Sequence, residues 1–194
     1  MKPTARMTTD EDATLVAHAQ AGDRAAFDAL VVRHARSVGR LARRVVGNVE
    51  DAEDVVQETF VRVYQHLAGF RGQSSFRTWM LRIALNLAHD RLRARSRAPS
   101  PHDLAAGVAP HDVRPPDHAA THRDDRAALD RAVAELPPRQ RLALLMKVVD
   151  GLTHVDIAKV LGTTESAARV YLAMARSTLR RRLASWWARD RRDS

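Results

Sequence analysis

Residues 151–182 read GLTHVDIAKVLGTTESAARVYLAMARSTLRRR, and this stretch decides the fold of the carboxy-terminal part of the chain. Thr153 and Asp156 have capping-box spacing, which predicts a short helix that ends at Gly162. Two threonines then form a tight turn, and a long basic helix is expected to begin near Glu165. A short helix, a glycine turn and a basic helix predict a helix-turn-helix, whose second helix enters the major groove of DNA.

The long helix is expected to have two different faces. Its inward face is an apolar stripe of Ala168, Leu172, Ala175 and Leu179. Its outward face carries Ser166, Arg169, Val170, Ala173 and Ser177. In a major groove Arg169 can form a bidentate contact to guanine, while the flanking Arg176 and Arg180 can hold phosphates. The alternative is a basic helix that only keeps a surface solvated, but the capped helix-turn-helix favours DNA binding.

Upstream of this motif the sequence divides into two parts. Apolar residues recur at three- and four-residue steps and β-branched alternation does not persist, so the expected fold class is all-α. Five of the eight prolines lie between Pro99 and Pro116. Because proline breaks helices, a flexible Pro-rich linker is predicted over 98–123. It joins two small helical domains, an amino-terminal helical bundle (10–97) and a carboxy-terminal helix-turn-helix domain (124–190).

Turn and capping residues predict where the other helices begin and end. The bundle is expected to contain a short first helix, a second capped by Asp23, a third over about 50–68, and a fourth that begins after Ser74 or Ser75. A proline pair precedes a further helix over 139–150. The predicted core stripe of the fourth helix is Phe76, Trp79, Met80, Ile83 and Leu87.

The composition is basic and lacks cysteine. Lysine and arginine number 32 against 23 acidic residues, which gives a formal net charge of +9. This charge favours nucleic acid as a partner, although ribosomal, membrane-surface and heparin-binding proteins share it. The absence of cysteine excludes disulfides, thiolate zinc sites and a thiol redox switch within the chain, and it suits a reducing cytoplasm. No apolar run has the length of a signal peptide or a membrane span, so a cytoplasmic protein is expected.

The third predicted helix carries acid in an otherwise basic protein. Asp51, Asp54, Gln57 and Glu58 lie opposite its apolar stripe. An acidic face repels DNA, so it is interpreted as a docking surface for a basic protein partner. The alternative is that the acidic residues of the first turn only stabilise the helix dipole.

A polar loop and a basic helix follow. The loop, residues 70–75, can hydrogen-bond an exposed base, and the next helix places Arg82, Asn86, His89 and Arg93 on one polar face. Unpaired bases expose their edges and cations follow the backbone, so this combination is a candidate site for single-stranded DNA.

These residues resemble the extracytoplasmic-function (ECF) group of sigma factors in the sigma-70 family over nearly the whole chain. The motifs that carry the resemblance are AGD at 21–23 with Ala26-Phe27, DAEDVVQETF at 51–60, FRTWMLRIALN at 76–86 with Asp90, LPPRQR at 136–141, GLT at 151–153, DIA at 156–158 and LG at 161–162. No single motif is decisive, but their order and spacing are specific.

The resemblance implies a transcription initiation factor that binds core RNA polymerase, directs it to specific promoters and promotes initiation, with no enzyme activity and no cofactor. It implies that the β′ clamp of the polymerase is bound by Asp51, Asp54, Gln57 and Glu58 of this chain. It implies that the melted minus-ten promoter element and its flipped base are held by residues of the loop and the following helix. These are Gly72, Gln73, Ser74, Ser75, Arg77, Arg82, Asn86 and Arg93. It implies that the duplex minus-thirty-five promoter element is bound by Ser166, Arg169, Val170, Ala173 and Arg176.

The resemblance also implies a contact with the polymerase β flap, a linker that threads toward the RNA exit region, and an anti-sigma factor that binds both domains. The recognition helix departs from the family pattern, because two usually basic positions are Tyr171 and Met174. His154 stands where an acidic or aromatic residue is common. The promoter sequence therefore does not transfer from the family.

Three other hypotheses are weaker. His102, His111, His118 and His122 lie in or near the linker, but their spacing fits no metal motif, so no metal site is expected. The chain has no glycine-rich phosphate loop and no cysteine nucleophile, which disfavours an enzyme. The main alternative is an ordinary helix-turn-helix regulator whose amino-terminal domain senses a ligand or dimerises.

Overall fold

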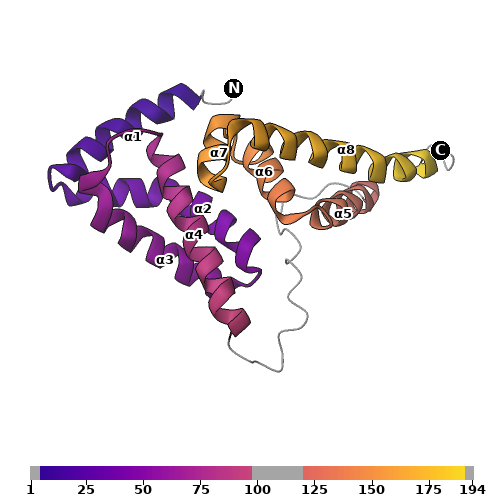
Figure 1. Ribbon diagram of the computed structural model, residues 1–194, viewed down its shortest axis with the longest axis horizontal. Coiled ribbons are helices and arrows are strands. Elements are labelled where there is room, and N and C mark those ends of the chain that lie inside the picture. The colour runs from indigo at the N-terminus through magenta and orange to yellow at the C-terminus, as the bar shows by residue number, and fades with distance from the viewer. Residues whose placement is uncertain (1–4, 98–119, 191–194) are drawn as a thin grey trace. The chain divides into compact units, whose positions relative to one another are not determined.

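The structure is a computed structural model that describes the backbone of residues 5–97 and 120–190 and the side chains of 11–96 and 126–184. The elements of the described parts are α1 (Ala5–Gln20), α2 (Arg24–Val46), α3 (Val49–His66), the short 3-10 helix η1 (Leu67–Gly69), α4 (Phe76–Arg97), α5 (Ala120–Ala134), α6 (Pro138–Val148), α7 (His154–Leu161) and α8 (Glu165–Asp190) (Figure 1). Every one of these elements is helical, so the predicted all-α fold class is confirmed.

The chain forms two compact units, one built mainly from residues up to 109 and the other mainly from residues after it. The units correspond to the two helical parts predicted from the sequence. The exact domain limits stay a prediction. The proposed linker lies mostly outside the described residues, as do the side chains of its four histidines.

In the first unit, α2 packs against α1, α3 and α4, and α3 packs against α4. The core between them is apolar, with Leu30, Val38, Val63 and Met80 fully buried. Each such side chain contributes roughly 1.5–3 kcal/mol relative to leaving it in water. The bundle thereby holds the outer faces of α3 and α4 at fixed positions.

Local capping explains where the helices of the first unit begin. The Oδ1 atom of Asp23 accepts hydrogen bonds from the backbone N–H groups of Ala25 (2.9 Å) and Ala26 (3.2 Å), which confirms the predicted cap of α2. The Oγ atom of Ser75 accepts from the N–H of Thr78 at 3.1 Å. Ser75, rather than Ser74, is therefore the residue that caps α4.

The second unit is held together by α8, which packs against α5 and α6. Ala168, Leu172 and Ala175 are buried on its inner face and Leu179 is half-buried, as the predicted stripe requires. The glycine turn between α7 and α8 has Gly162 in the left-handed region, at φ 61°.

The predicted capping box precedes α7. The Oγ1 atom of Thr153 accepts from the N–H of Asp156 at 3.1 Å, and a carboxylate oxygen of Asp156 accepts from the N–H of Thr153 at 3.3 Å. Thr164 caps α8 by accepting from the N–H of Ala167 at 3.1 Å. The helix-turn-helix is therefore specified by local side-chain contacts.

Several boundaries differ from the sequence prediction, among them the end of the helix predicted over 139–150, which is α6 and ends at Val148. The α geometry of α3 ends at His66, and the chain tightens into η1 before Gly69. Helix α5 begins at Ala120, inside the segment predicted as linker, because no proline follows Pro116 until Pro137. Within the described residues, no helix is both long enough and apolar enough to cross a membrane.

Candidate nucleic-acid and partner interfaces

The four predicted docking residues lie on one side of α3. Asp54, Gln57 and Glu58 are exposed, whereas Asp51 is half-buried. Asn48 caps the helix, accepting from the N–H of Asp51 at 2.8 Å and donating its amide to Oδ2 of Asp51 at 2.7 Å. Asp51 is thus part of the helix start as well as part of the acidic face.

Two arginines of α4 neutralise part of this acid. The Nε atom of Arg91 donates to Oδ1 of Asp51 at 2.7 Å, and the same guanidinium pairs with Asp54. Arg95 lies 3.7 Å from Oδ2 of Asp51. Further along α3, Nε of Arg62 donates to Oε1 of Glu58 at 2.8 Å. The acidic face is therefore a network of ion pairs rather than a row of isolated carboxylates.

These contacts shift the protonation of the pair. The hydrogen bond from Asn48, followed by that from Arg91, holds the pKa of Asp51 below its usual value, against the opposing effect of burial. The hydrogen bond to Asp51 raises the pKa of Arg91. Both groups are consequently charged at neutral pH, and the bridge between α3 and α4 is fully formed there.

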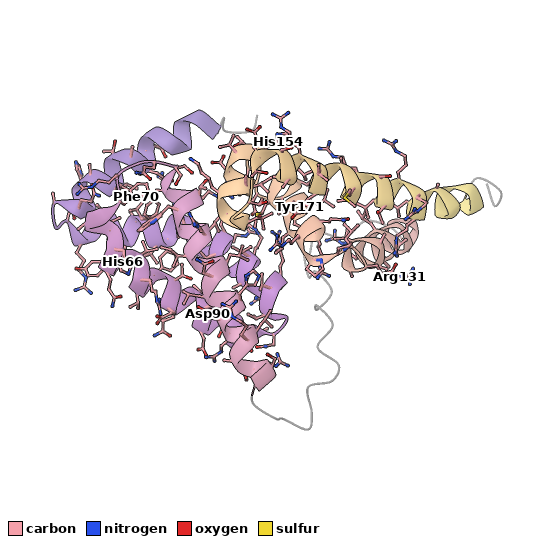
Figure 2. The ribbon with its side chains drawn as sticks, in the orientation of Figure 1. His66, Phe70, Asp90, Arg131, His154 and Tyr171 are labelled. Carbon is pink, nitrogen blue, oxygen red and sulfur yellow. The ribbon has the colours of Figure 1, made fainter. Side chains whose placement is uncertain are left out.

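The loop before α4 is held by aromatic packing. The ring centroid of Phe70, labelled in Figure 2, lies 4.9 Å from that of Trp79 and 6.1 Å from that of Phe76. The amide of Gln20 donates to the carbonyl oxygens of Leu67 (2.8 Å) and Phe70 (2.9 Å). The start of the loop, at Phe70, is thus fixed in position. Gln20 is a positioning residue that no sequence motif revealed.

The predicted minus-ten residues have different surroundings. Gly72 has φ 68°, which favours glycine, and Gly72 and Gln73 are exposed. Ser74 and Ser75 are half-buried; the Ser74 hydroxyl donates to the Ser75 carbonyl oxygen at 3.2 Å, and the Ser75 hydroxyl is engaged in the cap. Arg77 is also half-buried, with Nη2 3.4 Å from the Ser37 hydroxyl. Gly72 and Gln73 are accordingly the parts of the loop most open to a ligand.

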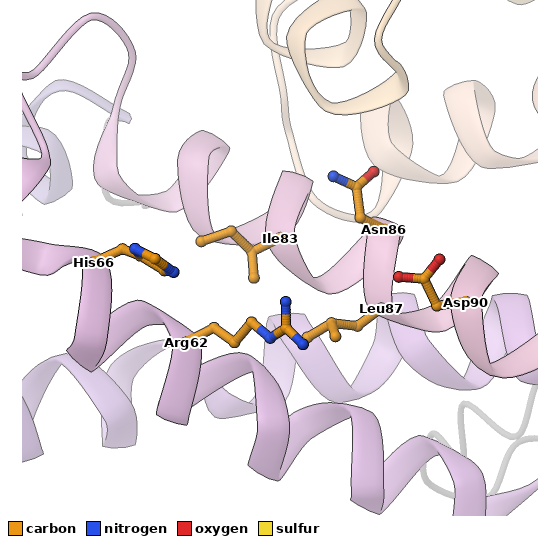
Figure 3. Close-up of a pocket in the computed structure, with 6 residues that line it drawn as sticks. All are labelled: Arg62, His66, Ile83, Asn86, Leu87 and Asp90. Atoms are coloured by element: carbon orange, nitrogen blue, oxygen red, sulfur yellow. The ribbon is translucent and has the colours of Figure 1, made fainter.

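A pocket of about 190 Å³ lies between α3 and α4 (Figure 3). Ile83 and Leu87 supply its apolar part, and its polar lining comes from Arg62, His66, Asn86 and Asp90. Asn86 is thus brought together with side chains of α3, while the loop at 72–75 does not line the pocket. Arg82 and Arg93 are exposed elsewhere on α4. Arg62 and His66 are site residues that sequence reasoning missed, and only the packing of α3 on α4 reveals them.

The predicted minus-thirty-five residues all lie exposed on α8: Ser166, Arg169, Val170, Ala173 and Arg176. The guanidinium of Arg169 donates twice to Oε1 of Glu165, from Nε at 3.0 Å and from Nη2 at 2.6 Å. Tyr171, labelled in Figure 2, accepts from Nη1 of Arg139 on α6 at 3.3 Å. The exposed face of α8 therefore extends from Ser166 to Arg176, with α6 beside it.

Neither unit offers a metal site in the part of the chain that the structure describes, since no group of three or more His, Cys, Asp or Glu side chains is suitably placed there. What the geometry provides is two surfaces. One combines an acidic helix face with a polar pocket, and the other is a capped helix-turn-helix. Two helical units with these surfaces define the class of DNA-binding transcription proteins.

Comparisons with known proteins identify the family. A family profile described as Sigma-70 region 2 matches residues 30–98, and one described as Sigma-70, region 4 matches residues 126–179. The RNA polymerase sigma-H factor of Pseudomonas aeruginosa is 34% identical over 181 residues, covering 89% of this chain and 94% of the relative. The ECF RNA polymerase sigma-E factor of Escherichia coli K12 is 34% identical over 176 residues, covering 87% and 92% respectively. The chain therefore belongs to the sigma-70 family, as an ECF sigma factor.

Solved structures agree with this assignment. CnrH, in a complex with the cytosolic domain of CnrY, is similar with a TM-score of 0.65 and 27% identity, covering 90% of this chain and 98% of that one. The sigma factor RpoE of Bartonella quintana shares the fold, with a TM-score of 0.62 at 20% identity over 81% of this chain and 96% of that one.

Proposed function

We propose that this protein binds core RNA polymerase, directs it to specific promoters and promotes the initiation of transcription. The observation that carries this proposal is the match of both units to sigma-70 regions in a chain that covers 94% of a named RNA polymerase sigma factor. Region 2 coincides with the unit that holds the acidic face and the pocket, and region 4 coincides with the helix-turn-helix. Each unit therefore has a separate task at one promoter.

The polymerase contact is assigned to α3. Asp54, Gln57 and Glu58 are exposed on one face, and a carboxylate-rich face suits a basic partner such as the β′ clamp. Asp51 supports this face by anchoring α3 to Arg91 of α4. A contact between the second unit and the β flap is a further part of the proposal, carried by family membership alone.

The melted minus-ten element is assigned to α4 and the loop before it. Asn86 offers a donor and an acceptor at a pocket whose apolar lining can pack against a ring, as an unpaired base requires. Arg82 and Arg93 are exposed on the same helix and can follow the phosphates. Gly72 and Gln73 provide exposed backbone and amide groups in the adjoining loop.

The duplex minus-thirty-five element is assigned to α8. Its exposed face carries Arg169 and Arg176 together with small side chains that allow close approach. The inner stripe holds the helix on α5 and α6, so the outer face can enter a major groove without rearrangement of the core.

An anti-sigma factor is a further proposed partner. Family membership supports it, and the RpoE structure, which shares the fold, is a complex with the anti-sigma factor NepR. We also propose that the protein acts in the cytoplasm, where core polymerase is found, and that it is an initiation factor without catalytic activity of its own.

One comparison tests the function against an ordinary helix-turn-helix regulator. The purified chain is mixed with core polymerase and passed through a sizing column, and in parallel with a labelled promoter duplex in a gel-shift assay. A sigma factor is expected to co-elute with the core enzyme and to bind duplex strongly only in that complex. Tight duplex binding by the chain alone, together with no co-elution, would identify a regulator instead.

A further inference from the structure

The outer face of α8 exposes two large apolar side chains. Val170 and Met174 each have 50% of their surface exposed. They are four residues apart, so they lie on the same side of the helix, one turn from each other. Together they form an apolar pair in the middle of the surface assigned to DNA.

The surroundings of this pair are cationic. Arg169, Arg176 and Arg180 are exposed on the same helix. Exposed apolar side chains on a basic helix indicate contact with a partner that is a polyanion with apolar groups of its own. Duplex DNA meets this description, because its phosphates flank the groove and the C5 methyl of thymine is the apolar group on the base edges.

A contact from α6 positions Met174. Nε2 of Gln140, at the start of α6, lies 3.8 Å from the sulfur of Met174. Three residues before Met174, the hydroxyl oxygen of Tyr171 accepts a hydrogen bond from Nη1 of Arg139. The Arg169 guanidinium, in contrast, is directed to Glu165. The apolar pair is therefore already presented, whereas Arg169 must leave a carboxylate before it can reach guanine.

We infer that Val170 and Met174 are specificity-determining residues that read thymine methyl groups in the upstream promoter element. This inference rests on the proposed function and names the chemistry that the second unit recognises. Val170 has no hydrogen-bonding group and the thioether of Met174 is only a weak acceptor, so neither side chain is suited to reading the polar pattern of the groove. They can distinguish thymine from the other bases by contact with its methyl group. The upstream element is consequently expected to contain at least one A·T pair opposite the first three turns of α8.

The experiment uses the holoenzyme, formed from the full chain and core polymerase. A promoter library first defines the preferred upstream element. Each thymine of that element is then replaced singly by deoxyuridine, which removes only the C5 methyl group. At one or two positions the replacement is expected to weaken holoenzyme binding about fourfold, which corresponds to ~0.8 kcal/mol for one buried methyl-sized group.

The protein variants make the test specific. Val170→Ala/Met174→Ala is expected to bind thymine and deoxyuridine promoters equally, because the contacting atoms are gone. Val32→Ala, which truncates a more exposed valine side chain on α2 (81% exposed, against 50% for Val170), is expected to keep the fourfold preference. Circular dichroism checks that the double variant stays folded, and Met174→Leu should retain most of the preference.

An upstream element without A·T pairs would overturn the inference. So would a deoxyuridine series without effect, or a preference that survives in the double variant. In all three cases a holoenzyme that still initiates at specific promoters leaves the proposed function intact. Failure to initiate at all would instead refute the proposed function.

Discussion

Arg91 on α4 is bonded to Asp51 on α3, with 2.7 Å between Nε of the arginine and Oδ1 of the aspartate. The two residues are 40 positions apart in sequence, so the contact exists only because the helices pack side by side. Asp51, an acidic residue of the proposed polymerase-binding face, therefore also holds α3 against α4. The acidic face of α3 is thereby connected to α4 through the ion pairs of Arg91 and Arg95.

The first prediction concerns the protonation of Asp51. Its pKa is lowered from 3.8, so the ionised form favours the folded state. The contribution of Asp51 to the free energy of unfolding is therefore fully present above pH 3.8, the pKa of the unfolded state. It is lost as the pH falls from 3.8 through the lower pKa of the folded state. A carboxyl-carbon NMR titration is expected to show Asp51 titrating below 3.8, and Arg91→Ala is expected to raise that midpoint.

The matched control is Arg82→Ala, which removes another exposed arginine of α4. It should leave the Asp51 titration unchanged. Equal midpoints in the wild type and Arg91→Ala would show that the bridge does not form in solution.

The second prediction concerns polymerase binding. Reversing charge in Asp54→Lys/Glu58→Lys is expected to reduce core affinity at least about tenfold, since like charges across an interface cost several kcal/mol. The fold should survive, because the exposed pairs with Arg91 and Arg62 contribute only about 0–1 kcal/mol each. Competition for labelled core enzyme measures the affinity. Asp28→Lys on α2 is the control, and an unchanged affinity in the α3 variant would refute the docking assignment.

A third prediction concerns promoter melting. Asn86→Ala removes the amide at the pocket and is expected to reduce open-complex formation roughly tenfold, within the 1–3 kcal/mol typical of a base contact. Permanganate reactivity of the melted thymines measures this step, and core binding should not change. Gln65→Ala, an exposed amide on α3 that does not line the pocket, should behave like the wild type. Normal promoter melting by the Asn86 variant would show that the pocket does not bind the minus-ten element.

A fourth prediction concerns Arg169. Replacement by alanine is expected to cost about 1–3 kcal/mol and to relax the preference at one upstream base pair, if the side chain reads guanine. Binding to a panel of single-base promoter variants measures the pattern. A loss of equal size on every sequence would make Arg169 a phosphate contact.

The fifth prediction concerns the stability of the helix-turn-helix. Thr153→Ala removes the hydroxyl that accepts the Asp156 N–H, and it is expected to cost about 1 kcal/mol. Urea unfolding of the full chain, followed by circular dichroism, should show the loss in the transition of the second unit. Ser177→Ala, on the exposed face of α8, should change stability by less than about 0.5 kcal/mol. Equal stabilities for the wild type and Thr153→Ala would show that the capping box is not formed.

Local features of the fold could be predicted from the sequence. The caps at Asp23 and Thr153 depend on residues two or three positions away, so spacing alone reveals them. The apolar stripe of α8 could be predicted because its residues recur at three- and four-residue steps. The predicted stripe of α4 was partly wrong, because Trp79, Ile83 and Leu87 are only half-buried, whereas Leu81, Ala84 and Leu85 are buried. Helix α4 packs against both α2 and α3, which a one-sided pattern does not reveal.

The site residues were harder to predict. The acidic face of α3 was visible as a pattern, but its ion pairs with Arg91 and Arg95 depend on the packing of α3 against α4. For the same reason His66 could not be assigned to a pocket with Asn86 from the sequence. One signal was available: Arg91 and Arg95 are four residues apart, on the side of α4 that meets an acidic helix.

The most direct test of the account is run-off transcription with purified core polymerase, with and without the protein, from a promoter library. We predict specific transcripts only when the protein is present, and we predict that they depend on two separated promoter elements, one read as duplex and one melted. Transcripts identical to those of the core enzyme alone would contradict the account.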